Sequence, residues 1–167
     1  MTRSIPVFAV LALLAACNDP GVDSFGDDVA NVQVPPRGNA DVFAWLEAGH
    51  YLAWSCEPEP HPRRPGSGHG PNRICSNTAL QTASGNGPYP VGAAAVKEIF
   101  DDAGQLRQYA VYRKMTAGTG GDSWYWYEGF GDDVVANAEG DDTCTGCHGR
   151  APRDFVYTVV PAGLPAE

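Results

Sequence analysis

The chain contains little lysine, little methionine and one extended apolar run. Its 167 residues include two lysines and two methionines, one of which is the initiator. The formal net charge is −9, which argues against nucleic acid and anionic membrane surfaces as partners, because both repel an acidic protein. The apolar run covers residues 5–13, and it is too short to cross a bilayer.

The N-terminus has the pattern of an export signal. Arg3 provides a positive charge ahead of the apolar run, and the segment LAAC that follows ends at Cys17 like a lipoprotein cleavage site. We predict a lipoprotein signal peptide over residues 1–17 with lipid on Cys17. The protein would then belong to the bacterial cell envelope, face the periplasm and contact the membrane through its lipid anchor alone. The alternative is an ordinary signal peptide with an incidental cysteine.

Composition divides the remaining chain into two parts. Residues 18–38 are acidic, rich in Asp, Pro and Gly, and almost without apolar periodicity, which predicts a flexible tether. Residues 39–167 are predicted to form one domain, and this length is sufficient to bury a hydrophobic core.

A C-x-x-C-H box formed by Cys144, Cys147 and His148 lies close to the C-terminus. This spacing is typical of c-type haem attachment, in which both thiols bond the haem edge and the histidine binds its iron. We therefore predict one covalent haem c, carried on a tight turn. Three alternatives are a thioredoxin-like dithiol, half of a zinc site, and a haem-free protein with a Cys144–Cys147 disulfide. A zinc site would need a second C-x-x-C pair, which the sequence lacks.

The five cysteines are an odd number for an exported protein, and the count needs an explanation. If Cys17 carries lipid and the box carries haem, Cys56 and Cys75 remain as a pair. They flank a Pro/Gly-rich loop over residues 57–72, and a disulfide across it would stabilise the fold by about 3 kcal/mol. We predict this disulfide, with two reduced buried cysteines as the alternative.

Hydrophobic periodicity predicts an α+β domain, mainly an antiparallel β-sheet with a few short helices. One helix is expected from Asn39 or Asp41, and a short second helix is expected from an Asn77 cap through Gln81. The predicted strands are residues 94–100, 105–115, 123–130 and 153–160, with a hairpin turn at 101–104. The haem-binding turn is expected between the last two strands.

The position of the box bears on the second axial ligand of the iron. No methionine follows it, and Met115 is the one methionine outside the signal peptide. An iron without a strong sixth ligand is open to small molecules such as nitric oxide, carbon monoxide or hydroxylamine. The alternative is an electron-transfer cytochrome c, without catalysis, whose sixth ligand is Met115 or one of His50, His61 and His69.

Residues 41–160 resemble the cytochrome P-460 family, which includes the gas-binding cytochromes c′-beta. The matching stretches are WLEAGHY at 45–51, GAAAVKE at 92–98, WYWYE at 124–128, and the C-x-x-C-H box followed by DFV at 154–156. The resemblance implies a β-rich haem domain, commonly homodimeric, with five-coordinate iron below an open pocket. The acidic charge is compatible with a basic redox partner protein. The open iron predicts a small diatomic or nitrogenous ligand that is bound or oxidised.

The same resemblance brings Lys97 forward, because catalytic members bond a lysine in this context to the porphyrin edge. Lys97 is therefore a candidate haem cross-link, with a solvated strand lysine as the alternative. Catalytic members also place a carboxylate over the iron from the strand that here contains Ala110, where none is present. Glu98 or Glu128 would replace it only if the fold directs one of them into the pocket. Ligand binding or electron transfer is therefore easier to support than hydroxylamine oxidation.

Overall fold

The computed structural model describes residues 34–163. The predicted signal peptide, the predicted lipidation site Cys17 and most of the predicted tether lie outside these residues. Within residues 34–163, none of the helices has the length and apolar character needed to cross a membrane.

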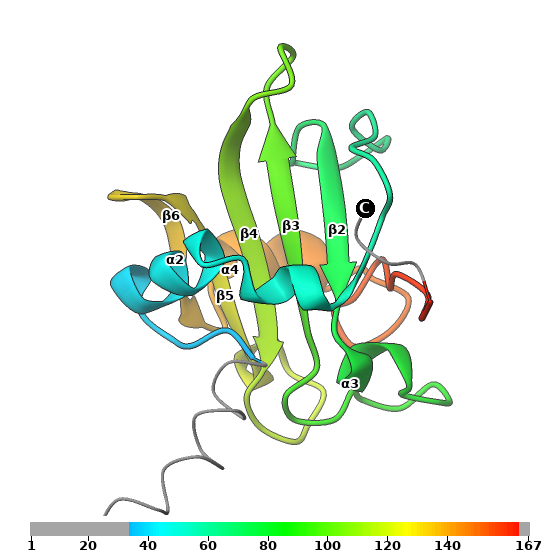
Figure 1. Cartoon of the computed structure of the whole chain (residues 1–167). Coiled ribbons are helices and arrows are strands. Elements are labelled where there is room, and N and C mark those ends of the chain that lie inside the picture. The colour runs from blue at the N-terminus through cyan, green and yellow to red at the C-terminus, as the bar shows by residue number, and fades with distance from the viewer. Residues whose placement is uncertain (1–33, 164–167) are drawn as a thin grey trace, which may run out of the picture.

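One six-stranded antiparallel sheet forms the centre of the domain, and each strand pairs with the next along the chain. The strands are β1 (Ser55–Cys56), β2 (Asn72–Ser76), β3 (Ala94–Phe100), β4 (Leu106–Lys114), β5 (Trp124–Phe130) and β6 (Asp133–Glu139). Within the described residues, five short helical segments accompany them: α2 (Asn39–Glu47), η1 (His50–Ala53), α3 (Thr78–Gln81), η2 (Gly121–Ser123) and α4 (Asp142–His148). The predicted α+β class is confirmed (Figure 1).

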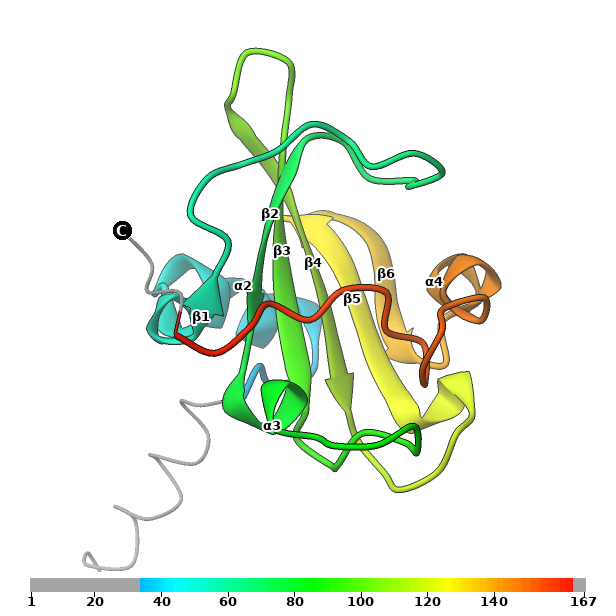
Figure 2. The same cartoon turned by 90° about the vertical axis from the view of Figure 1, so that its right-hand side faces the viewer.

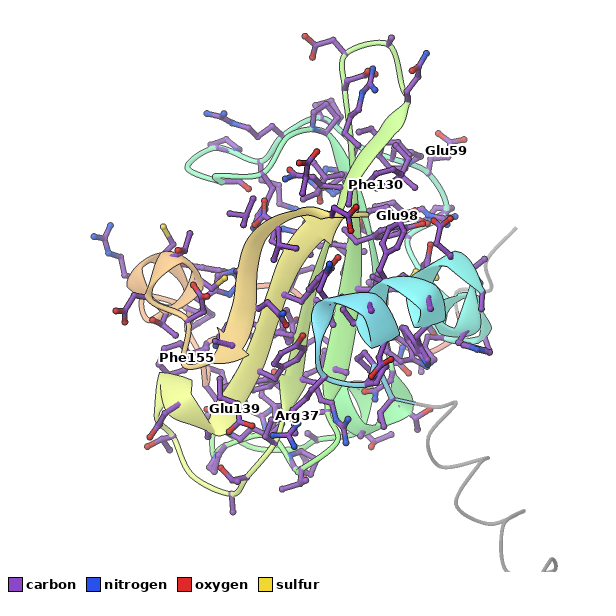
Figure 3. All side chains as sticks on the ribbon, turned by 90° about the vertical axis from the view of Figure 1, so that its left-hand side faces the viewer. Arg37, Glu59, Glu98, Phe130, Glu139 and Phe155 are labelled. Atoms are coloured by element: carbon purple, nitrogen blue, oxygen red, sulfur yellow. A yellow bond between two sulfur atoms is a disulfide. The ribbon has the colours of Figure 1, made fainter. Side chains whose placement is uncertain are left out.

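The two long faces of the sheet are covered differently. Helix α2 lies across one face, whereas α4 and the C-terminal segment lie on the other (Figures 2 and 3). Because side chains alternate along each strand, β4 contributes Tyr109 and Val111 to a core under α2. The opposite face holds a second core that includes Trp124 and Trp126 of β5.

Several local predictions agree with the structure. Strand β3 has the predicted bounds, and Gly104 in the hairpin after it has φ +77°, a conformation that favours glycine. Asn77 caps α3, because its Oδ1 accepts a hydrogen bond from the Leu80 N–H at 3.0 Å. Helix α2 begins after Gly38 instead of using Asn39 or Asp41 as its cap. Asn39 instead contacts other elements, and its Oδ1 accepts a hydrogen bond from the Tyr127 hydroxyl.

The prediction of a strand over residues 153–160 is wrong. This segment crosses the sheet face as irregular chain, with an isolated bridge between Arg153 and Val156. Asp154 and Phe155 have φ values of +39° and +67°, which are incompatible with an extended strand. The last strand is instead β6, which the sequence pattern does not indicate, and the C-x-x-C-H box follows this strand instead of lying between two strands.

The domain begins before residue 39, where the predicted tether ends. Pro35 is fully buried, and its carbonyl accepts a hydrogen bond from Arg113 Nη1 at 2.8 Å. Arg37 forms an ion pair with Glu139 of β6 (Figure 3). Residues 34–38 therefore belong to the folded unit.

The predicted cysteine pair is a disulfide in the structure. Cys56 and Cys75 lie opposite each other in the β1–β2 register, and both are fully buried. Their bond closes the base of the β1–β2 loop, which we define as residues 57–71. This loop reaches over the sheet face on which α4 lies (Figure 2).

Candidate functional site

A cavity of about 630 Å³ lies between α4 and the sheet, and this volume is in the range of small-molecule and cofactor sites. Strands β2 to β5 form its floor, and the β1–β2 loop and residues 157–158 contribute to its rim. Its lining is mainly apolar, and its acidic and basic side chains outside the C-x-x-C-H box are Arg64, His69, Lys97 and Glu128.

Helix α4 presents all three residues of the C-x-x-C-H box to this cavity. Cys144, Cys147 and His148 each line it, because residues three and four positions apart share one face of a helix. The box is thus helical, where a tight turn was predicted. Asp141 begins the helix by accepting a hydrogen bond from the Thr143 N–H at 3.0 Å, and this cap compensates for the poor helix propensity of Gly146.

The His148 ring is held in one tautomer. Its Nδ1 lies 2.7 Å from the backbone oxygen of Phe155, and because a carbonyl only accepts hydrogen bonds, Nδ1 donates. Nε2 therefore keeps the lone pair that a metal ligand needs. Burial lowers the pKa of His148 to about 4, so the ring is neutral at pH 7. The ring packs against Trp126, with their centroids 4.8 Å apart.

The thiols of the box do not have the character of a redox dithiol. Cys144 and Cys147 are not bonded to each other. Burial, together with the nearby charges of Asp141 and Glu128, raises the pKa of Cys144 to about 12. A thioredoxin-like cysteine has a lowered pKa instead. No cluster of three or more His, Cys, Asp and Glu side chains suited to a metal ion occurs within residues 34–163, so the zinc alternative finds no second pair of ligands there.

Lys97 projects from β3 into the cavity. The alternation of the strand did not decide this placement, because Lys97 and Glu98 put one charge on each face. Burial, together with the nearby charge of Arg64, lowers the pKa of Lys97 to about 8. The structure thus places Lys97 on the same cavity as the box. A cross-link to haem stays a prediction.

The two candidate carboxylates, Glu128 and Glu98, lie on opposite faces of the sheet. Glu128 of β5 lines the cavity, where its Oε2 lies 3.5 Å from Nδ1 of His69 in the β1–β2 loop. Glu98 lies on the opposite face of the sheet (Figure 3), where it forms an ion pair with Arg73 and accepts a hydrogen bond from Tyr51. Of the two candidates, the fold directs Glu128 toward the pocket. Nothing in the sequence indicated its pairing with His69, because the two residues meet only through the folded loop.

The other predicted iron ligands lie away from the cavity. Met115 packs against the core under α2, and the His50 ring packs against Trp45 at 5.8 Å between centroids. His61 pairs with Glu57 at the base of the loop. Met115 is therefore not placed to be the sixth ligand in this fold.

The residues present fit a covalently attached haem. Two thiols and one neutral imidazole face a single cavity with an aromatic wall, and a backbone carbonyl fixes the tautomer of the imidazole. Cys144 and Cys147 would hold the macrocycle, and His148 would bind the iron. No protein-family model matches this chain, and a comparison with curated proteins finds no match.

Proposed function

We propose that this protein is a c-type haem protein, with one haem bonded to Cys144 and Cys147 and with His148 as the protein ligand of the iron. The observation that carries the proposal is the shared direction of the three side chains, which all line the cavity beside α4. A dithiol explains two thiols but does not explain the half-buried, neutral histidine held by Phe155. A zinc site would need further ligands, and residues 34–163 contain no cluster that provides them.

We further propose that the iron is five-coordinate and binds or oxidises small nitrogenous ligands such as nitric oxide or hydroxylamine. Haem iron with an open position binds such molecules and can exchange electrons with them. Met115 lies on the other face of the sheet, which argues against it as the sixth ligand. The cytochrome P-460 and c′-beta resemblance supports this proposal and adds a homodimer to it. The acidic charge is compatible with a basic redox partner protein, and the predicted lipid anchor would hold the protein at the periplasmic surface.

The ionisable side chains of the cavity define what the protein itself would contribute. The Glu128 carboxylate can accept a proton from a bound ligand, and His69 beside it can share that proton. Both side chains are shielded from solvent, with exposed fractions of 17% and 19%. This pair supplies the acid–base group whose absence near Ala110 argued against turnover.

A second candidate function is electron transfer with His69 as the sixth ligand. The observation that favours it is that His69 is the one histidine besides His148 that lines the cavity. A His69→Ala variant separates the two functions. An electron carrier would change from a low-spin to a high-spin spectrum, whereas a five-coordinate ligand-binding protein would be high-spin before and after the change.

The experiment that tests the proposal is mass spectrometry of the full chain after periplasmic expression with a cytochrome maturation system. We expect the mass of one haem on the peptide containing Cys144 and Cys147, and none in a Cys144→Ser/Cys147→Ser control. Attachment of a Lys97 peptide to the same haem would establish the cross-link. Addition of nitric oxide and carbon monoxide to the reduced protein should shift its absorbance.

Two outcomes would contradict the proposal. A chain without haem under these conditions would overturn the attachment. A haem-bearing protein with a low-spin spectrum that does not respond to either gas would overturn the open iron and favour electron transfer.

A further inference from the structure

A fully buried ion pair lies beside the segment that follows α4. Lys114, the last residue of β4, places its Nζ 2.9 Å from Oδ2 of Asp154, and their side chains have exposed fractions of 0% and 2%. Lys114 also donates to the carbonyl of Gly118 at 2.6 Å and to Ser123 Oγ at 2.8 Å. The ammonium group therefore has a complete set of acceptors inside the protein.

Asp154 is surrounded by donors. In addition to Lys114, its carboxylate accepts hydrogen bonds from the backbone N–H of Tyr89 at 2.7 Å and from Trp124 Nε1 at 3.3 Å. These donors come from β4, from β5 and from the segment before β3. Asp154 thus connects the segment after the C-x-x-C-H box to three separate parts of the fold.

The segment that contains Asp154 has an unusual backbone conformation. Asp154 and Phe155 are consecutive, and among the residues that the structure describes they are the non-glycine residues with positive φ. Such conformations are unfavourable for side-chain-bearing residues and persist where surrounding contacts determine them. The turn places the Phe155 carbonyl 2.7 Å from Nδ1 of His148.

We propose that the Lys114–Asp154 pair is a positioning element for His148, which acts by holding the left-handed turn whose Phe155 carbonyl accepts the Nδ1 proton. A buried ion pair is poor evidence for stability, because desolvation of both charges offsets their attraction and apolar side chains serve the core equally well. A fixed carbonyl next to the proposed iron ligand explains why this particular pair is present.

The inference rests on the proposed function, because its consequence is measured as a change in the properties of the haem iron. A hydrogen bond from the second nitrogen of a metal-bound imidazole raises the basicity of the ligand and fixes the orientation of its ring. Release of the turn should weaken this bond. His148 would then donate less electron density, so the iron–histidine bond should weaken and the reduction potential should rise.

The test compares Asp154→Asn with Glu98→Gln in the full, haem-bearing chain. Both substitutions neutralise the carboxylate of a buried ion pair, but Glu98 pairs with Arg73 on the opposite face of the sheet. Both variants should lose stability to urea. Asp154→Asn should in addition lower the iron–histidine stretching frequency in the resonance Raman spectrum and raise the reduction potential, whereas Glu98→Gln should change neither.

A milder variant, Trp124→Phe, removes the Nε1 donor to Asp154 and keeps an aromatic ring, so it provides the same readouts if Asp154→Asn does not fold. An unchanged stretching frequency and potential in the folded Asp154 or Trp124 variants would overturn the positioning role and leave a purely structural ion pair. The mass of the parent protein separates this result from failure of the proposed function, in which no haem is attached.

Discussion

The two faces of the sheet differ in how completely they are packed, although the same strands form both. On the α2 face, polar groups are paired within the protein, as Glu98 is with Arg73 and Tyr51. On the α4 face, aromatic residues fill one part, and the rest is a cavity into which Lys97 and Glu128 project. The comparison indicates that the α2 face contributes mainly to stability, whereas the α4 face contains the cavity in which the proposed haem would lie.

The largest expected effect on stability comes from the α2 face. Leu46 is 1% exposed in the core under α2, so Leu46→Ala should lower the free energy of unfolding by about 2–5 kcal/mol. Leu52 is 41% exposed, and Leu52→Ala serves as the matched control, with a change within about 0.5 kcal/mol. Urea unfolding measures both. If the Leu46 variant also changed ligand binding while folded, the two faces would not be independent.

Removal of the disulfide should have a comparable or smaller effect. Cys56 and Cys75 are 19 residues apart in sequence, and their replacement by alanine should cost about 3 kcal/mol, because the unfolded chain gains freedom. Haem content, measured by absorbance per chain, should stay at the parent value in the folded variant. A proportional loss of haem would show that the loop base and the cavity are coupled.

The smallest effect should appear at Lys97, and it depends on pH. The pKa of Lys97 is lowered from 10.5 to about 8, so between these pH values the unfolded chain binds more protons than the folded chain. The free energy of unfolding of a haem-free Cys144→Ser/Cys147→Ser chain should therefore rise from about pH 8 to 10.5 relative to the same chain with Lys97→Met. Parallel pH profiles for the two chains would mean that Lys97 is solvated.

The sequence predicted the elements that local patterns mark. The turn at Gly104 and the cap at Asn77 depend on residues within a few positions of one another. Strand β3 is marked by its own run of residues, although its pairing partners are β2 and β4. Strand β6 was missed because Val134 and Val135 are both exposed, so it lacks the alternation of a half-buried strand.

The wrong prediction concerns a segment whose backbone conformation depends on residues far away in the sequence. The run after Arg153 is rich in β-formers, yet Lys114 and Trp124 hold Asp154 in a left-handed conformation. The candidate haem residues were identified by a short motif, because C-x-x-C-H is contiguous in the chain. The neighbours of this motif in space, such as His69 and Phe155, were accessible only from the fold.

The β1–β2 loop has a consequence for how the protein can be varied. Both of its ends are fixed by strand pairing and by the Cys56–Cys75 bond, and the entropic cost of closing a loop grows slowly with its length. Loops of other lengths and sequences can therefore be exchanged at this position while the sheet and α4 keep their structure. The rim that contains Arg64 and His69 can therefore vary independently of α4. Under the proposed function, such variation would change the choice of ligand and leave the proposed haem attachment unchanged.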